Sequence, residues 1–202
     1  MNIEIRPVMY KDIDNIVQIH IRAFSGFFMT KLGGNFLKVY YRTVFDYSGK
    51  IFLAAEYDGL LIGFVAGFIN PAKFYSLMKD RKIRFALSIL PSLFRNPRLI
   101  LQVWRNFRRI NDSNNESNKI EVELASIAVD PSYTRKGCGK LLVKAFLEKA
   151  QQLGADVVYL TTDAQNNDAV NYFYQSLGFI LYRTFETSSD RIMNEYRFYF
   201  EK

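Results

Sequence analysis

The residues best suited to do chemistry lie between Val129 and Leu142, where two glycines stand among three basic side chains. The glycines are Gly137 and Gly139, at the start of an amphipathic stretch, and the basic residues around them are Arg135, Lys136 and Lys140. The first N–H groups of a helix have no partner inside the helix, and together with the helix dipole they attract anions. Glycine lets an anion approach the backbone closely because it has no side chain. The segment therefore predicts a diphosphate site at the beginning of a helix.

Two common nucleotide motifs do not fit this spacing. A P-loop has four residues between its glycines and a Ser or Thr after its Lys, whereas a single residue separates these glycines and Leu141 follows Lys140. A dinucleotide-binding turn needs a third glycine where Leu142 stands. The pair of glycines is also compatible with a plain strand-to-helix turn, so the neighbouring elements have to decide between the two interpretations.

Composition excludes several other kinds of chemistry. The 202 residues include one Cys, Cys138, and one His, His20. An internal disulfide, a cysteine-rich metal site and catalysis by paired histidines are therefore excluded, and no cluster with metal-ligand spacing predicts a metal. Cys138 has no partner base nearby in the sequence and is interpreted as a small apolar filler. Hydrophobic residues make up 49% and aromatic residues 16% of the chain, which is typical of a single globular domain over residues 1–202.

The net charge of +7 is concentrated in one segment. The window from Lys73 to Arg109 holds ten basic residues and one acid, Asp80, so it carries +9 and the rest of the chain −2. No dedicated nucleic-acid motif accompanies this charge, so no specific nucleic-acid partner is expected. The longest uncharged apolar run, Leu60 to Ile69, is too short to span a bilayer, and the N-terminus lacks the apolar region of a signal peptide. We expect a cytoplasmic protein.

Hydrophobic periodicity predicts strands and helices in a mixed α/β order. The expected strands are residues 3–6, 51–57, 60–69, 120–129, 157–162, 179–185 and 192–200. The expected helices are residues 10–23, 36–45, 137–153 and 168–177. Asp58-Gly59 between two apolar runs predicts a tight hairpin. Residues 71–118 form a basic insertion with helical periodicity around 83–90 and 99–110, which Pro91 and Pro97 are expected to break apart, followed by a polar linker over 111–118.

Two segments in this order resemble the GNAT acyltransferase superfamily. The first is Thr134-Arg135-Lys136-Gly137-Cys138-Gly139, which follows a strand and is similar to the family's acetyl-CoA loop. The second is Asn167 to Phe179, NDAVNYFYQSLGF, which looks like the family's N-x-x-A-x-x-[FL]-Y-x-x-x-G-F segment with Val170 in place of the Ala. Thr134 stands where the family usually has Arg or Gln. The resemblance is strong over residues 121–185, weak over 3–69, and absent over 71–118.

The resemblance implies a fold, a cosubstrate and a set of residues that bind it. The fold is a central mixed, mostly antiparallel, twisted sheet flanked by helices, and the cosubstrate is acetyl-CoA. The pyrophosphate would lie against Thr134, Arg135, Lys136, Gly137, Cys138, Gly139 and Lys140. The pantetheine arm would contact the backbone of Ile127, Ala128 and Val129, with a hydrogen bond from Asn167. Tyr174 would also contact the cosubstrate and would protonate the thiolate that leaves.

Direct acyl transfer requires a neutral amine, so a base or a water chain should lie near it. Glu121 and Glu123 alternate with Ala125 and Ile127, which by the two-residue period of a strand would put all four on one face. Glu123 is the candidate base, and Glu121 and water remain as alternatives. His20 is a candidate for lining the acceptor pocket.

The acceptor and the insertion leave several interpretations open. The enzyme hypothesis is an N-acetyltransferase acting on a primary amine of a small molecule or peptide. The stretch Ala23 to Gly33 resembles family members often found with surface-polysaccharide genes, which would suggest an amino sugar. The alternative is a non-catalytic CoA-binding module whose basic insertion docks on membrane or nucleic acid. Residues 71–118 could pack on the domain, cover the acceptor, contact a membrane surface peripherally or form a homodimer contact.

Overall fold

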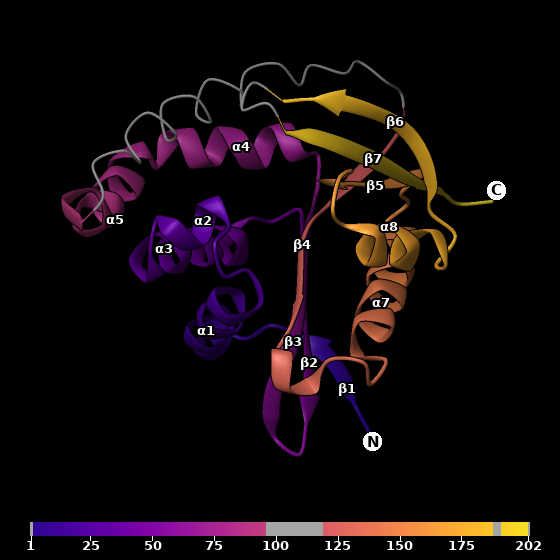
Figure 1. Ribbon diagram of the computed structural model, residues 1–202, viewed down its shortest axis with the longest axis horizontal. Coiled ribbons are helices and arrows are strands. Elements are labelled where there is room, and N and C mark those ends of the chain that lie inside the picture. The colour runs from indigo at the N-terminus through magenta and orange to yellow at the C-terminus, as the bar shows by residue number, and fades with distance from the viewer. Residues whose placement is uncertain (1, 96–118, 188–190, 202) are drawn as a thin grey trace.

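One seven-stranded sheet organises the molecule. In a computed structural model, which describes residues 2–95, 119–187 and 191–201, the strand order is β1-β2-β3-β4-β5-β7-β6 (Figure 1). Only β4 and β5 pair in parallel, and every other neighbouring pair is antiparallel. The strands are β1 (Glu4–Pro7), β2 (Lys50–Tyr57), β3 (Leu60–Ile69), β4 (Glu121–Val129), β5 (Val157–Asp163), β6 (Ile180–Glu186) and β7 (Ile192–Tyr199). The expected mostly antiparallel sheet is confirmed.

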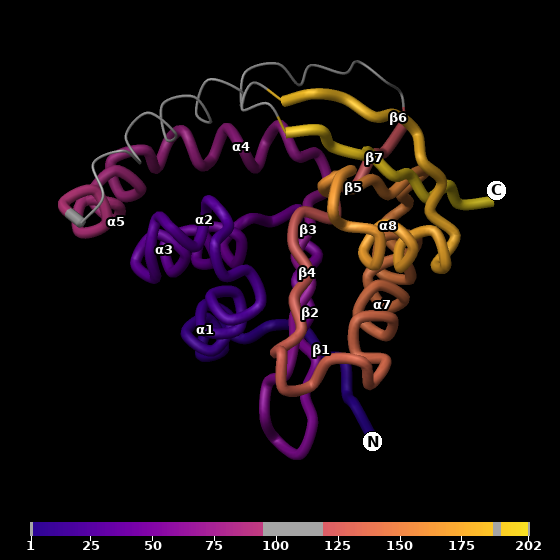
Figure 2. Tube along the Cα trace, in the orientation of Figure 1, coloured from indigo at the N-terminus to yellow at the C-terminus, as the bar shows by residue number. Residues whose placement is uncertain are grey.

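Helices cover both faces of the sheet. The helices on one side of the sheet precede β4 in the chain, and those on the other side come after β4 (Figures 1 and 2). The first group is η1 (Tyr10–Asp12), α1 (Ile13–Ala23), α2 (Phe28–Lys31), α3 (Gly34–Asp46), α4 (Pro71–Asp80) and α5 (Lys82–Arg95). The second group is the short turn η3 (Pro131–Tyr133), α7 (Cys138–Gln152) and α8 (Asp168–Gln175). A single sheet with helices on two faces requires two separate hydrophobic clusters.

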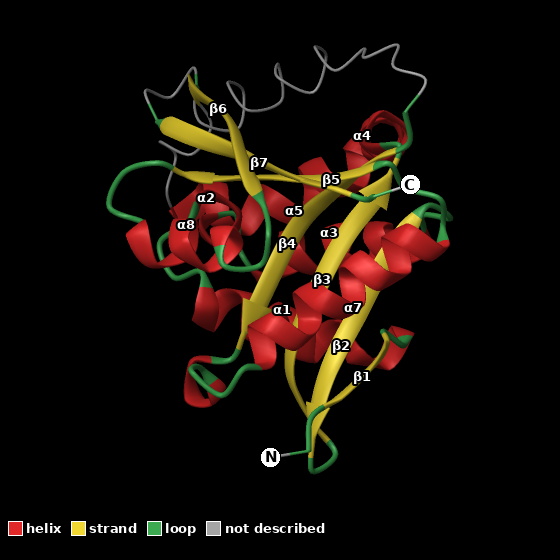
Figure 3. Ribbon diagram, turned by 90° about the vertical axis from the view of Figure 1, so that its right-hand side faces the viewer, coloured by secondary structure: helices red, strands yellow, loops and turns green. Residues whose placement is uncertain are grey.

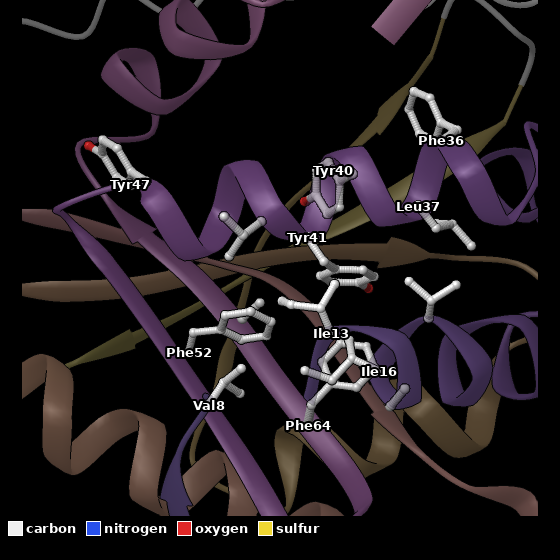
Figure 4. Close-up of a cluster of buried hydrophobic side chains, with 14 of the residues drawn as sticks. Val8, Ile13, Ile16, Phe36, Leu37, Tyr40, Tyr41, Tyr47, Phe52 and Phe64 are labelled. Carbon is white, nitrogen blue, oxygen red and sulfur yellow. The ribbon is translucent and has the colours of Figure 1, made fainter. Parts of the chain in front are cut away.

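The cluster under α1, α3, α4 and α5 is strongly aromatic. Figure 4 shows Tyr41 extending from α3 toward Phe52 of β2 and Phe64 of β3, and its ring centroid lies 5.9 and 5.2 Å from theirs. Phe74 of α4 is fully buried and stacks on Phe68 of β3 with 3.6 Å between ring centroids. The other cluster lies beneath α7 and α8 and is mainly aliphatic, with Leu142, Val143, Val158 and Leu160 among its members. Large buried aromatic areas of this kind account for much of a fold's stability.

The hairpin between β2 and β3 forms as its turn residues predict. Asp58 and Gly59 both have positive φ, 50° and 75°, which is the backbone geometry of the tight turns that suit the twist of a two-stranded ribbon. Every β2 residue from Lys50 to Tyr57 has a partner on β3. This local signal was sufficient to predict the element.

Helices α4 and α5 differ from the sequence-based expectation. The stretch that becomes α4 had no predicted helix, and Pro91 was expected to break the segment, but α5 continues through Pro91 to Arg95. A proline inside a helix costs about 3 kcal/mol. Phe85 and Ile89 are buried before it, and Ser92 Oγ donates to the carbonyl of Leu32 at 2.7 Å after it, so tertiary contacts offset that cost. The predicted stretch at 99–110 and the linker at 111–118 lie outside the described residues.

Candidate active site

Strands β4 and β5 pair for three residues and then part. The paired residues are Glu121 with Val157, Val122 with Val158 and Glu123 with Tyr159. Beyond Glu123, β4 continues to Val129 with β3 as its partner, whereas β5 continues to Asp163 paired with β7, and Figure 3 shows the two strands diverging. The β5-facing backbone edge of β4 is therefore not paired with β5 over Leu124 to Val129. This edge contains Ile127, Ala128 and Val129, the residues expected to contact the pantetheine arm.

The glycine segment connects the far end of β4 to α7. Gly137 has φ of 79° and is the N-cap of α7, and no side chain caps the first N–H groups of the helix. A Cβ built at Gly137 would meet no atom within 4 Å, so the space in front of the helix start is open. Exposed N–H groups at a helix start with free space before them suit a phosphate group. This geometry is compatible with an anion site at the start of α7, which stays a prediction.

The side chains around this helix start have different surroundings. Arg135, Lys136 and Lys140 are exposed, and the Lys136 ammonium lies over the Tyr133 ring, 5.1 Å from its centroid. Thr134 instead donates its hydroxyl proton to the carbonyl of Pro131 at 3.1 Å, so its side chain holds the loop in shape. Three exposed cations beside the helix start create a positive field there.

Cys138 is buried within the cluster beneath α7. Burial raises the pKa of its thiol to about 11, so it stays protonated at neutral pH although it begins a helix. This environment agrees with a small packing residue and gives no support to a reactive thiolate.

A bulge in β4 changes which side chains share a face. Partners on β3 run from Phe68 opposite Glu123 to Ala66 opposite Ser126, so β4 carries an extra residue between them. Gly67 lies at the bulge, where a Cβ would clash with the Glu123 carbonyl oxygen and the ring of Phe146.

The expectation that Glu121, Glu123, Ala125 and Ile127 share one face of the strand was therefore wrong for Ile127. Ala125 packs against the α1–α5 cluster, and Glu123 meets α4 on that same side. Ile127 belongs instead to the cluster beneath α7. A one-residue insertion reverses the alternation of side chains, which no two-residue period could reveal.

Glu123 lies at the point where β4 and β5 part, and tyrosines surround it. The Tyr75 hydroxyl donates to its two carboxylate oxygens, at 3.0 and 3.1 Å. Tyr40 of α3 and Tyr159 of β5 lie close enough for the carboxylate charge to raise the pKa of each phenol further, beyond the effect of burial. Burial raises the pKa of Glu123 to about 7, and the Tyr75 hydrogen bond opposes that rise. A carboxyl group with this pKa is suited to exchanging protons near neutral pH.

Glu121 has a different environment. It accepts from Arg197 Nη1 at 3.3 Å, and Arg197 also pairs with Glu195 at 2.7 Å. The guanidinium of Arg197 lies over the Tyr182 ring, 3.8 Å from its centroid. Of the two acids on β4, Glu121 is engaged in an ion-pair network, whereas Glu123 forms no ion pair with a cation among the described residues.

Tyr174 and Asn167 lie on the α8 side. Tyr174 is 6% exposed, its ring contacts those of Phe173 and Phe179, and burial raises the pKa of its hydroxyl. It is therefore protonated and able to donate at neutral pH. Asn167 precedes α8 and donates its amide to Thr162 Oγ1 and the Asp163 carbonyl, at 2.8 and 3.0 Å. Its predicted hydrogen bond to the cosubstrate would therefore use the amide oxygen.

His20 is a buried packing residue with a polar partner. Its Nδ1 lies 2.7 Å from the Tyr41 hydroxyl, which lies 3.4 Å from Ser126 Oγ at the bulge of β4. Burial lowers the pKa of His20 to about 4, so it is neutral at pH 7. Its Nε2 is buried without a hydrogen-bond partner in the part of the chain that the structure describes. The role of His20 in lining an acceptor pocket stays a prediction.

The sequence did not reveal Tyr75. It is one of 13 tyrosines, and it lies 48 residues from Glu123 in a segment with no recognisable motif. Its position follows from the start of α4 and from the pairing of β3 with β4, and neither fact can be obtained from local spacing.

Metal ligation and membrane crossing find no support in the described ranges. No group of three or more His, Cys, Asp or Glu side chains is arranged to hold a metal ion there. None of the helices described has both the length and the apolar character needed to cross a membrane.

Comparison with known families gives an independent assignment. The model of the Acetyltransferase (GNAT) family matches residues 13–179. This match covers most of the chain and includes β4, the glycine segment, α7, β5 and α8.

Individual relatives are more distant. The [Ribosomal protein bS18]-alanine N-acetyltransferase of Escherichia coli strain K12 is 37% identical over 59 residues, which are 29% of this chain and 39% of that protein. The chain thus matches well under half the length of this curated relative. The crystal structure of the ribosomal-protein-S18-alanine N-acetyltransferase from Escherichia coli aligns over 100% of this chain and 96% of that one, with a TM-score of 0.62 and 15% identity. The PaiA N-acetyltransferase of Thermoplasma acidophilum in complex with coenzyme A aligns over 98% and 100%, with a TM-score of 0.55 and 16% identity.

Proposed function

Because the chain belongs to the Acetyltransferase (GNAT) family, we propose that it is an enzyme that transfers the acetyl group of acetyl-CoA to a primary amine. The observation that supports this most directly is the parting of β4 and β5 beside the uncapped start of α7. The unpaired edge of β4 would bind the pantetheine arm, and the N–H groups after Gly137 would bind the pyrophosphate. The relative that binds coenzyme A has the same fold, which agrees with this assignment.

Glu123 and Tyr174 would each carry out one proton transfer of the reaction. The amine lone pair attacks the thioester carbonyl carbon, a C–N bond forms and the C–S bond breaks. Glu123 would accept the proton that the amine loses, directly or through water, and Tyr174 would give a proton to the departing thiolate. The net result is an amide and free CoA thiol, with one proton moved from nitrogen to sulfur. A carboxyl group with a pKa of about 7 and a buried, protonated phenol suit these two roles.

The acceptor is proposed at the level of chemical class. The likeness of Ala23 to Gly33 to proteins found with surface-polysaccharide genes favours an amino sugar, and the short match to an enzyme that acetylates a ribosomal-protein alanine favours a peptide N-terminus. Both are primary amines and would need the same base. We propose the amino sugar as the first candidate and the N-terminal peptide as the second.

An acetylation screen tests the proposal. Purified protein is mixed with acetyl-CoA and, in separate reactions, amino-sugar nucleotides, alanine-starting peptides, lysine peptides and polyamines, with release of free CoA thiol as the readout. Mass spectrometry of the acceptor then verifies the added acetyl group. Turnover above that of the Glu123→Gln variant with at least one amine class supports the proposal. Tight acetyl-CoA binding with no turnover on any class would favour the non-catalytic module instead.

A further inference from the structure

Helix α4 is fixed firmly at the end where it meets β3. Asn70 adopts the left-handed conformation with φ of 55°, Pro71 opens the helix, and the Tyr47 hydroxyl donates to the carbonyls of Ile69 and Asn70 at 2.7 and 3.0 Å. Phe74 stacks on Phe68 in the core one turn later. Since Phe68 is the β3 partner of Glu123, these contacts place the side of α4 that carries Tyr75 directly against the candidate base.

The contact between Tyr75 and Glu123 differs from an ordinary surface hydrogen bond. One phenol hydroxyl lies within hydrogen-bond distance of both carboxylate oxygens, at 3.0 and 3.1 Å, so it can hold the carboxyl plane in one orientation. Hydrogen bonds to an ionised acceptor in a partly buried site are among the stronger ones in proteins. The Tyr75 ring also contacts those of Phe68 and Phe74, with centroids 6.4 and 5.5 Å apart.

We propose that Tyr75 of α4 is a positioning residue for the reaction: it orients the carboxylate of Glu123 and keeps it in the form that accepts a proton from the amine. This inference rests on the proposed role of Glu123 as the base. It gives α4, which belongs to the basic insertion at residues 71–118, a specific part in the active site. The residue acts through Glu123 and need not touch the acceptor.

The other groups that face Glu123 do not offer the same stabilisation. Tyr40 from α3 and Tyr159 from β5 lie near the carboxylate, whose charge raises the pKa of each phenol in addition to burial, but neither donates a hydrogen bond to Glu123 in the part of the chain that the structure describes. Glu121, two residues away on β4, is paired with Arg197. Of these neighbours within the described ranges, only Tyr75 donates a hydrogen bond to the Glu123 carboxylate, and it is the group that lowers the pKa of Glu123 against the effect of burial.

Loss of the Tyr75 hydroxyl should raise the pKa of Glu123. Tyr75→Phe keeps the ring and removes the donor, so the charged form of Glu123 loses stabilisation and its pKa rises. Loss of one hydrogen bond to a charged group corresponds to a rise of about one pH unit. A base must be deprotonated to act, so at pH 7 the active fraction would fall about fivefold, while the rate at high pH would recover.

The experiment has two arms and a matched control. In the first, the carboxyl carbon of Glu123 is titrated by NMR in protein labelled with ¹³C-glutamate, and the signal is assigned by its loss in Glu123→Gln. This arm needs no acceptor. In the second, the pH profile of kcat/KM is measured with an amine that turns over in the screen above. The control is Tyr47→Phe, which removes a tyrosine hydroxyl that holds the start of the same helix through the carbonyls of Ile69 and Asn70 and not through Glu123.

We expect the pKa of Glu123 and the midpoint pH of the acidic limb of the kcat/KM profile to rise together in Tyr75→Phe. Both should stay at their wild-type values in Tyr47→Phe. An unchanged pKa in folded Tyr75→Phe overturns the proposal, and so does an equal rise in both variants, because the effect would then come from the position of the helix. A raised pKa with an unmoved acidic limb overturns the catalytic role of Glu123 while leaving the Tyr75 hydrogen bond in place. The two failures are therefore distinguishable.

Discussion

The two sides of β4 carry two different kinds of candidate site. Toward α7 lies an exposed helix start with positive φ at Gly137, open space and three exposed cations, and backbone N–H groups are its main binding elements. Toward α4 lies a partly buried carboxylate among tyrosines, and side chains from three other elements set its properties. A site built from backbone N–H groups can be recognised in a short sequence motif. A carboxylate whose pKa is set by burial depends on residues far apart in the chain.

The largest effect should come from the carboxylate side. Glu123→Gln keeps the shape of the side chain and removes its ability to accept a proton. We expect kcat/KM to fall by about 100- to 10,000-fold, with the acidic limb near pH 7 lost from the residual profile. Acetyl-CoA affinity by calorimetry should stay near normal, because the carboxylate side does not bind the diphosphate. A profile that keeps its acidic limb would assign the base to water or another residue.

A second variant tests whether the chemistry also needs the α8 side. Tyr174→Phe removes one hydroxyl and little volume from a buried ring. We expect kcat to fall by about 10- to 1000-fold with near-normal acetyl-CoA binding, as for the loss of a general acid. Pre-steady-state measurement of the acetyl-transfer step checks this without interference from product release. A normal transfer rate would make Tyr174 a packing residue only.

The backbone side should respond in affinity. Gly137→Val places a branched side chain in the open space before α7 and in a conformation that β-branched residues avoid. We expect the Kd for acetyl-CoA to rise by about 10- to 100-fold, which corresponds to the loss of one or two good phosphate contacts.

Gly59→Val is the matched control for that variant. Gly59 also has positive φ, 75°, and open space around a built Cβ, but it lies in the hairpin turn between β2 and β3. Both variants should lose similar stability in thermal unfolding, and only Gly137→Val should lose acetyl-CoA affinity. Equal affinity losses would mean that backbone strain, and not a diphosphate site, explains the result.

Local patterns in the sequence predicted the features that depend on single residues and missed those that depend on distant contacts. The hairpin at Asp58-Gly59 and the start of α7 at Gly137 depend on the φ preferences of single residues, so local patterns were sufficient. The continuation of α5 through Pro91 depends on the Ser92 contact with Leu32, sixty positions earlier in the chain. The face of Ile127 depends on a bulge, and the Tyr75 contact depends on the path of α4. Each of these is set by tertiary contacts that a local pattern does not contain.

The central claim is that acetyl-CoA lies along the unpaired edge of β4 and across the start of α7, away from α4. Titration of ¹⁵N-labelled protein with acetyl-CoA, followed by backbone amide NMR, tests it most directly. The account predicts the largest shift changes at Ile127 to Val129 and at Gly137 to Lys140, with small changes over Pro71 to Asp80. Changes concentrated on α4, or saturable binding that leaves the Gly137 to Lys140 amides unmoved, would contradict it.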